Sequence, residues 1–338
     1  MLKDTYLVVG GGGFIGGHLI KRLLEEGNKI IATDIKPKQY WFQTFDDVKS
    51  YADTDMKDYE NCLKATKGVD YIFNMACNMG GMGFIENNKT KCMLSVLINT
   101  NLLRASVENK VKKYFFASTA CVYSTLKQKN TFVEGLKEED AYPAMPEDGY
   151  GWEKLFSERM CRHFMEDFGI QVRVARYHNV YGPIGTYDGG REKVPAAICR
   201  KIASAVINKK NQIEIWGDGK QTRSFLFIDD CIEGTLRLFN SNRSEPTNIG
   251  SDEQVSINQM VNIVKKISGI KNLKRKYLLH KPKGVRGRSS DNTNAIKALN
   301  WKFSISLNDG LKKTYNWILS ELKKINQILI NSVVLKLF

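Results

Sequence analysis

Residues 6–16, YLVVGGGGFIG, decide the fold of this chain. A short apolar run ends in four consecutive glycines, and the apolar spacing of a helix follows. Gly10, Gly13 and Gly16 recur every third residue, as in the loop that joins a strand to a helix around a dinucleotide. Glycine there permits a tight turn and close approach of the backbone to a pyrophosphate, whose charge the helix N-terminus stabilises.

Two further features of the N-terminal region predict the cofactor. Asp34 follows the next predicted strand, residues 29–33, where a carboxylate can bind ribose hydroxyls and would repel a 2′-phosphate. The sequence therefore predicts NAD rather than NADP, although Lys36 lies nearby. The residues expected to contact the cofactor beside the glycines and Asp34 are Phe14, Ile15, Asp55 and Met56.

The order of the remaining segments predicts an α/β protein. Apolar strands (residues 69–75, 113–117 and 171–175) alternate with helical patterns (97–108 and 149–168), as in a Rossmann-type, doubly wound parallel sheet. We expect an NAD-binding domain at residues 1–180, with residues 225–230 leading a return to the sheet within 224–250. Residues 181–223 and 251–325 would form a smaller C-terminal substrate-binding domain, and residues 326–338 an apolar tail packed on the body or on a partner.

A hydroxyl and an amine four residues apart predict the chemistry. Tyr150 and Lys154 share one face of a predicted helix. A phenol ionises near pH ~10, but a neighbouring ammonium and a nicotinamide charge would lower its pKa. Tyr150 would then act as the base in oxidation of an alcohol, and Lys154 would also hold the nicotinamide ribose. Thr119, at the end of a predicted strand, is the expected hydrogen-bond partner of that alcohol.

These motifs resemble the extended short-chain dehydrogenase/reductase family over nearly the whole chain. Further motifs resemble those of the GDP-mannose 3,5-epimerases within this family. These motifs are MGGMGF at 79–84, STAC at 118–121, RYHNVYGP at 176–183, GGREK at 189–193, WGDG at 216–219, QTRSF at 221–225 and GVRGR at 284–288. The related 4,6-dehydratases carry an Asp-Glu pair where this chain has Ala120 and Cys121. In the epimerases, the resemblance assigns Cys121 and Lys193 as an opposed acid/base pair.

The resemblance also implies a substrate and its contacts. The C4 alcohol of GDP-mannose would be oxidised by NAD, which acidifies C3 and C5; Cys121 would abstract a proton and Lys193 deliver one, and reduction would yield GDP-L-galactose. Gln221, Arg223 and Arg288 would bind the nucleotide diphosphate, as arginine suits phosphate oxygens. The other residues expected to line the substrate pocket are Gly81, Met82, Thr119, Asn179, Glu192 and Lys201.

Other functions remain open from the residues. A nucleotide-sugar mono-epimerase, a 4-epimerase or a dehydratase would share the cofactor site, but a 4-epimerase needs no second base. A non-catalytic NAD-sensing protein would typically lack Tyr150 or Lys154. The chain departs from the epimerase pattern at Asn78 and at Leu94-Ser95, which makes inversion at C5 alone the main alternative.

Composition narrows the remaining classes. The net charge of +15 comes from dispersed lysines, which indicates solvated faces rather than nucleic-acid binding. Seven scattered cysteines without a C-x-x-C pair predict free thiols and a cytoplasmic location. The apolar tail is too short to cross a bilayer, and we expect no leader before the first strand. We expect a homodimer, no metal site, and structural packing for His178 rather than catalysis.

Overall fold

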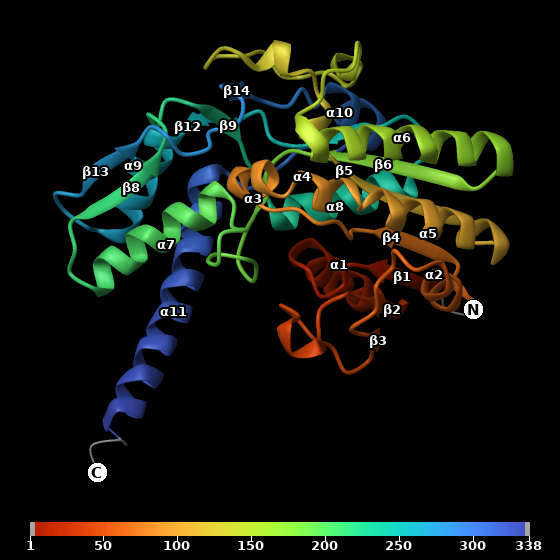
Figure 1. Ribbon diagram of the computed structural model, residues 1–338, viewed down its shortest axis with the longest axis horizontal. Coiled ribbons are helices and arrows are strands. Elements are labelled where there is room, and N and C mark those ends of the chain that lie inside the picture. Colours follow the sequence, from red (N-terminus) through yellow and green to blue (C-terminus); the bar gives the residue numbers. More distant parts are fainter. Residues whose placement is uncertain (1–3, 335–338) are drawn as a thin grey trace.

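The computed structural model describes residues 4–334 and centres on one parallel sheet (Figure 1). The sheet has the order β11-β6-β5-β4-β1-β2-β3. The strands are β1 (Thr5–Val9), β2 (Lys29–Thr33), β3 (Lys49–Tyr51), β4 (Tyr71–Asn74), β5 (Lys113–Thr119), β6 (Gln171–Tyr177) and β11 (Thr247–Ile249). The order reverses between β1 and β4, and ligands of such sheets bind at the carboxyl ends of strands beside this switch point. The predicted doubly wound fold is confirmed.

Helices cover both faces of the sheet. Successive residues of a strand point to opposite faces, so they pack into different hydrophobic clusters. Val8 belongs to one hydrophobic cluster, which also takes residues of α1 and α8, whereas Leu7 and Val9 belong to another, which takes residues of α5 and α6. The helices of this half are α1 (Phe14–Glu25), α2 (Tyr59–Thr66), α5 (Val96–Glu108), α6 (Asp148–Phe168), α8 (Ile228–Asn240) and α10 (Thr293–Leu299). Short 3₁₀ helices lie at Lys38–Tyr40, Ala120–Val122, Thr125–Gln128 and Glu138–Ala141.

A second group of elements lies beyond the carboxyl ends of the sheet. Helices α7 (Val194–Ile207), α9 (Ile257–Ser268) and α11 (Leu307–Val334) pack against one another. Three small sheets accompany them: β8 (Gln212–Trp216) with β13 (Lys274–Leu278); β9 (Thr222–Ser224) with β12 (Gln254–Ser256) and β14 (Gly287–Arg288); and β7 (Val180–Tyr181) with β10 (Leu226–Phe227). Helices α3 (Met82–Asn87) and α4 (Lys89–Met93) lie between the two groups (Figure 1).

One prediction about the C-terminal half is wrong in detail. Residues 225–230 do not return to the main sheet, because β10 is only two residues long, pairs with β7 and leads at once into α8. The strand that returns is β11, which pairs with β6 after α8 has crossed the sheet. The predicted tail begins within α11, which projects away from the body in Figure 1. Ile325 and Ile328 are exposed on this single chain, so they do not pack on the body, and packing on a partner stays a prediction. Residues 335–338 lie outside the described range.

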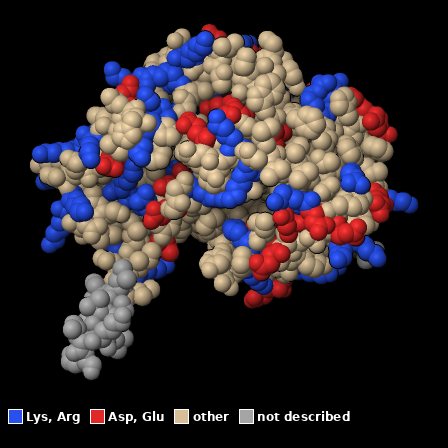
Figure 2. Space-filling model, in the orientation of Figure 1, with Lys and Arg blue, Asp and Glu red and all other residues tan. Residues whose placement is uncertain are grey.

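Charged side chains are spread over the face shown in Figure 2 rather than gathered in one patch. On the face in Figure 2, Lys and Arg side chains are spread over the molecule and interspersed with Asp and Glu. This distribution agrees with the prediction that the dispersed lysines form solvated faces. Within the described part of the chain, no helix is long and apolar enough to span a membrane.

Candidate active site

The glycine loop has the geometry that a dinucleotide requires. Gly10 has a φ of +82° and donates its amide to the carbonyl of Thr33 at 2.8 Å, which joins the loop to the end of β2. A Cβ at Gly16 would overlap the carbonyl oxygen of Gly10, so only glycine fits there. Gly13 is the N-cap of α1 and has no side chain to bind the first amides of the helix. Those amides remain available to a pyrophosphate, so the residues fit NAD.

Asp34 lies at the adenosine side of this loop. It is buried at the end of β2, and burial raises the pKa of its carboxyl, although its Oδ1 accepts a hydrogen bond from the amide of Lys36 at 3.0 Å. The Lys36 ammonium donates to the carbonyl of Gly12 at 2.6 Å. Met56 is buried, and Asp55 pairs with Lys57 at 3.2 Å. Asp34 is thus a buried carboxylate next to the glycine loop, and its contact with the ribose stays a prediction.

Tyr150 and Lys154 are both buried on the first turns of α6. The Lys154 Nζ donates to the carbonyl of Ala117 in β5 at 3.1 Å and lies 6.0 Å from the centroid of the Tyr150 ring. Burial alone would lower the pKa of Lys154. The electrostatic effects of its neighbours, led by Cys77 and Glu153, outweigh burial and raise this pKa. Lys154 therefore stays charged beside the carboxyl end of the sheet.

The protein surroundings of Tyr150 act on the pKa of its phenol in the direction opposite to the one predicted for an ammonium and a nicotinamide charge together. Burial raises the pKa of Tyr150 well above its usual value, and the thiols of Cys77 and Cys121 raise it further. The hydroxyl of Thr119 acts in the opposite direction by hydrogen bonding. Desolvation is the largest of these effects, because it disfavours the charged phenolate. These surroundings by themselves favour the neutral phenol, whereas the positive charge that bound NAD would supply favours the phenolate.

The structure brings Cys121 and Lys193 into one electrostatic environment. Thr119 ends β5, and its Oγ1 accepts a hydrogen bond from the amide of Cys121 at 3.3 Å. Burial raises the pKa of Cys121 to about 11. Burial lowers the pKa of Lys193, and Cys121 and Cys77 act against that shift. Two elements far apart in sequence, the end of β5 and the start of α7, thus meet at the site.

Cys77 is a site residue that the sequence analysis missed. It is half-buried and packs against the cluster that holds Cys121 and Tyr150. No spacing rule distinguishes it from the other cysteines in the sequence. The backbone amide of the neighbouring Asn78 donates to the hydroxyl of Ser95 at 2.9 Å. The two departures from the epimerase pattern, at Asn78 and at Leu94-Ser95, therefore lie at one contact.

Arg288 lies deeper than its predicted role at the diphosphate implies. Its three guanidinium nitrogens contact Gln128 at 2.6 Å, the sulfur of Cys121 at 3.6 Å and the carboxylate of Glu147 at 2.7 Å. Arg223 is buried beside it, and burial lowers the pKa of Arg223 to about 10. Glu147 had no sequence signal and was also missed.

Gly81 and Glu192, two of the remaining predicted substrate residues, lie on two segments that touch. The amide of Gly81 donates to the carbonyl of Arg191 at 3.1 Å, and a Cβ at Gly81 would come within 2.6 Å of the Glu192 carbonyl oxygen. The MGGMGF and GGREK segments therefore pack backbone to backbone. Side chains of the predicted residues form protein contacts: Glu192 accepts from Arg200, Asn179 donates to the Ser224 carbonyl, Lys201 to that of Glu214, and Gln221 to that of Trp216.

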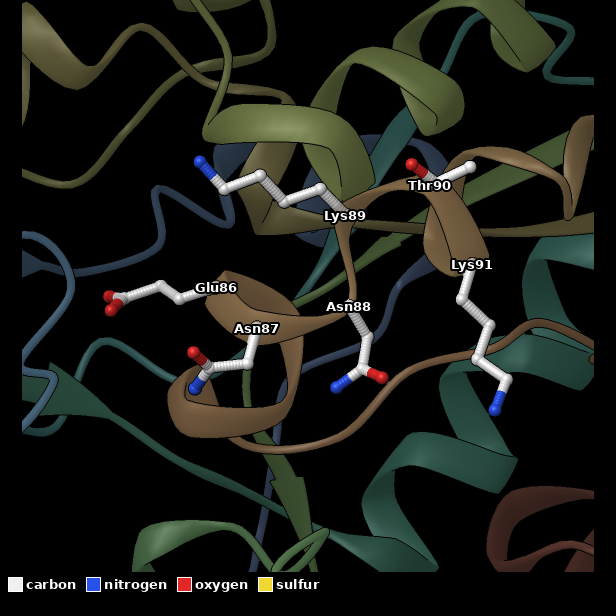
Figure 3. Close-up of a pocket in the computed structure, with 6 residues that line it drawn as sticks. All are labelled: Glu86, Asn87, Asn88, Lys89, Thr90 and Lys91. Carbon is white, nitrogen blue, oxygen red and sulfur yellow. The ribbon is translucent and has the colours of Figure 1, made fainter.

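A pocket of about 860 Å³ opens beside these loops. Met82 and Glu147 line it, together with residues 280–286 and the α3–α4 segment. A smaller pocket of about 440 Å³ lies on that segment alone and contains none of the predicted catalytic residues. Figure 3 shows its side chains, with Glu86 and Lys91 extending in opposite directions from the ribbon. Because Glu86, Asn87 and Lys89 line both pockets, α3 and α4 form a wall of the larger one.

Comparison with known proteins identifies the class that this fold and site define. Residues 6–250 match the NAD dependent epimerase/dehydratase family, and the chain belongs to that family. The predicted fold class and the predicted cofactor, NAD, are confirmed.

Relatives within the family show to which of its enzymes the chain is similar. The chain is 47% identical over 321 residues to GDP-mannose 3,5-epimerase 1 of Oryza sativa subsp. japonica, covering 94% of this chain and 82% of the rice protein. It is 46% identical over 322 residues to GDP-mannose 3,5-epimerase of Arabidopsis thaliana, with the same coverage. UDP-glucuronic acid 4-epimerase from Bacillus cereus, solved with UDP-glucuronic acid and NAD, superposes with a TM-score of 0.79 at 26% identity, covering 93% of this chain and 98% of that protein. The resemblance found in the sequence is confirmed.

Proposed function

We propose that this protein is an NAD-dependent GDP-mannose 3,5-epimerase that inverts C3 and C5 to give GDP-L-galactose. The observation that carries the proposal is that the buried residues Tyr150, Lys154, Thr119 and Cys121 adjoin the partly buried Lys193. The similarity to plant GDP-mannose 3,5-epimerases supports the choice of sugar and base. A 4-epimerase requires only Tyr150, Lys154 and Thr119 of these residues.

The first group of residues controls the C4 oxygen. NAD, when bound, supplies the reversible oxidation of the C4 alcohol. Tyr150 accepts the hydroxyl proton as a phenolate, a form that Lys154 and the positive charge of bound NAD would favour, and later returns the proton, while Thr119 positions the oxygen by a hydrogen bond. Once C4 is a ketone, these hydroxyls stabilise the enolate that forms when C3 or C5 loses a proton. Lys154 holds a fixed positive charge beside them.

The pair Cys121 and Lys193 exchanges protons with the ring carbons. Burial disfavours the charged form of each side chain, which favours a thiol and a neutral amine. A thiolate with an ammonium contains the same number of protons. In each inversion, one member of the pair takes a proton from the ring carbon and the other member gives one to it. The inversion therefore converts the thiol and amine into the thiolate and ammonium, or the reverse. The second carbon then meets a pair prepared to work in the opposite direction.

The larger pocket supplies a site for the nucleotide diphosphate. Its lining carries more cations than anions: the basic residues are Lys89, Lys129, Lys281, Lys283 and Arg286, and the acidic ones are Glu86, Glu147 and Asp148. Such an excess favours a pyrophosphate. We assign residues 1–180 and 224–250 to the cofactor domain and residues 181–223 and 251–325 to the substrate domain, with this pocket at the substrate side.

An apolar surface supports a homodimer in the cytoplasm. Met93, Leu94 and Leu97 of the α4–α5 segment are exposed, as are Trp152 and Phe156 of α6, which packs against both α4 and α5. Exposed apolar side chains concentrated on neighbouring helices are typical of a protein interface. Trp152→Glu should convert a dimer into monomers by sedimentation analysis, and a wild-type monomer would refute the interface. The seven free cysteines accord with a reducing compartment.

Incubation with GDP-mannose in deuterated water tests the proposed function. The sugar should gain deuterium at C3 and C5 and none at C4, and NMR should identify GDP-L-galactose, with GDP-L-gulose as a singly inverted intermediate. Label at C5 alone would make the protein a mono-epimerase. Loss of water with label at C6 would indicate a dehydratase.

A further inference from the structure

Glu147 has an environment that the reaction outlined above does not explain. It is the N-cap of α6, three residues before Tyr150, and its side chain is 10% exposed. A buried carboxylate is costly unless its charge is compensated. Burial acts to raise the pKa of Glu147, but the charge and hydrogen bond of Arg288 outweigh it and lower the pKa. Glu147 is therefore a buried anion at the active site.

The backbone holds Glu147 beside Cys121. The amide of Glu147 donates to the carbonyl oxygen of Cys121 at 2.9 Å, and a Cβ at Gly151 would overlap that same carbonyl. The start of α6 and the 3₁₀ turn that carries Cys121 are thus packed at closest approach. Neither residue can move independently of the other.

One guanidinium joins the two side chains. Arg288 donates through Nη2 to Oε2 of Glu147 at 2.7 Å, and through Nη1 it contacts the sulfur of Cys121 at 3.6 Å. Gln128 accepts from Nε at 2.6 Å and completes the orientation of the guanidinium. The second oxygen of Glu147, Oε1, is buried without a hydrogen-bond partner among the described residues.

We propose that Glu147 is a positioning residue for Cys121: it holds Arg288 against the sulfur and, by its own negative charge, keeps the thiol protonated in the resting enzyme. The inference rests on the proposed function, because it assigns Cys121 to proton transfer. Without Glu147, the positive charge of Arg288 at the sulfur would be unopposed and would favour the thiolate. With Glu147, Cys121 is held as the thiol before the substrate reacts.

Other charges face the same sulfur and have to be considered. The titratable or charged neighbours of Cys121 are Glu147, Tyr150, Lys193, Arg223 and Arg288. Of these, Glu147 has the largest individual effect on the pKa of the thiol and raises it, while Arg288 lowers it. Both act in addition to burial, which is the main cause of the raised pKa. The charge of Glu147 is therefore a suitable single change for a test.

The experiment measures the titration of Cys121 directly. The rate at which iodoacetamide alkylates Cys121, followed by peptide mass spectrometry across pH, reports the thiolate fraction. Glu147→Gln keeps the shape and removes the charge, and it should move the midpoint down by about one to two pH units. Asp148→Asn is the matched control: this neighbouring carboxylate also lines the pocket but pairs with Lys89, and its removal should leave the midpoint unchanged.

A second variant keeps the test decisive if Glu147→Gln folds poorly. Glu147→Gln with Arg288→Met removes both charges, and replacing both members of a buried ion pair is often tolerated. The double variant should bring the midpoint back towards that of the wild type. An unchanged or raised midpoint in Glu147→Gln, or no return in the double variant, would overturn the proposal. The alkylation readout needs no sugar, so failure of GDP-mannose to react would count against the proposed function alone.

Discussion

The cofactor half and the substrate half of this protein are built in different ways. The cofactor site comes from contiguous chain: the glycine loop, the start of α1 and Asp34 at the end of β2 lie within the first 34 residues. The substrate side joins segments separated by up to 167 residues, as the contact between Cys121 and Arg288 shows. A local site depends on backbone conformation, whereas a site assembled at long range depends on buried charges that compensate one another.

Tyr150→Phe should have the largest effect, because this side chain serves both halves. Removal of the hydroxyl leaves the ring in place but prevents proton removal from the C4 alcohol. Deuterium incorporation at C3 and C5 should fall by about 10²–10⁴-fold, the usual contribution of a general acid or base. Tyr142→Phe, at an exposed tyrosine, is the control. Wild-type exchange in Tyr150→Phe would show that another residue controls C4.

Cys121→Ala should damage the substrate half alone. Exchange at the ring carbons should fall by about 10²-fold or more, because one member of the acid/base pair is missing. NAD binding and oxidation at C4 should persist, and transient reduction of the cofactor can be followed by absorbance. Cys199→Ala, at a thiol buried in α7, should retain exchange. If Cys121→Ala exchanges normally, the thiol takes no part in proton transfer.

Gly16→Ala should damage the cofactor half alone. The added Cβ would overlap the Gly10 carbonyl oxygen, and such overpacking costs about 1–3 kcal/mol, equivalent to roughly ten- to hundredfold weaker NAD binding. Calorimetric titration with NAD would measure it. Gly17→Ala, whose Cβ would meet only the side chain of Gln43, should bind NAD nearly as the wild type does. Equal affinities in both variants would contradict the local nature of this site.

The smallest effect concerns His178, at the end of β6 where the two halves meet. It is fully buried, as its predicted packing role requires, and burial lowers its pKa from 6.5 to about 3. Above pH 6.5 neither the folded nor the unfolded chain binds the proton; as the pH falls from 6.5 towards 3, only the unfolded chain does. The free energy of unfolding therefore decreases with falling pH in that window.

His178→Gln should reduce this acid sensitivity. It should also cost about 1 kcal/mol at neutral pH, because the hydrogen bond of His178 to Asn248 is weakened. Thermal unfolding at neutral and mildly acidic pH measures both effects. An equally steep decline of the melting temperature in the variant would assign the acid sensitivity to other groups.

Sequence by itself determined the fold class, the cofactor and the identity of the family, because these depend on local rules. Glycine spacing, the acidic residue after β2 and the four-residue separation of Tyr150 and Lys154 each express a backbone or helix geometry that short-range chemistry dictates. The strand that returns to the sheet was misplaced, because pairing of β11 with β6 depends on how α8 crosses the sheet.

Only the tertiary structure decided how the charges around the reactive groups are arranged. Cys77 and Glu147 carry no motif and became site residues through packing against Cys121 and Tyr150. The protein surroundings of Tyr150 raise the pKa of its phenol, an effect that the sequence does not reveal, because desolvation depends on every atom that excludes water from the phenol. Burial and long-range ion pairs are properties of the assembled chain, whereas spacing along the sequence specifies only which groups are present.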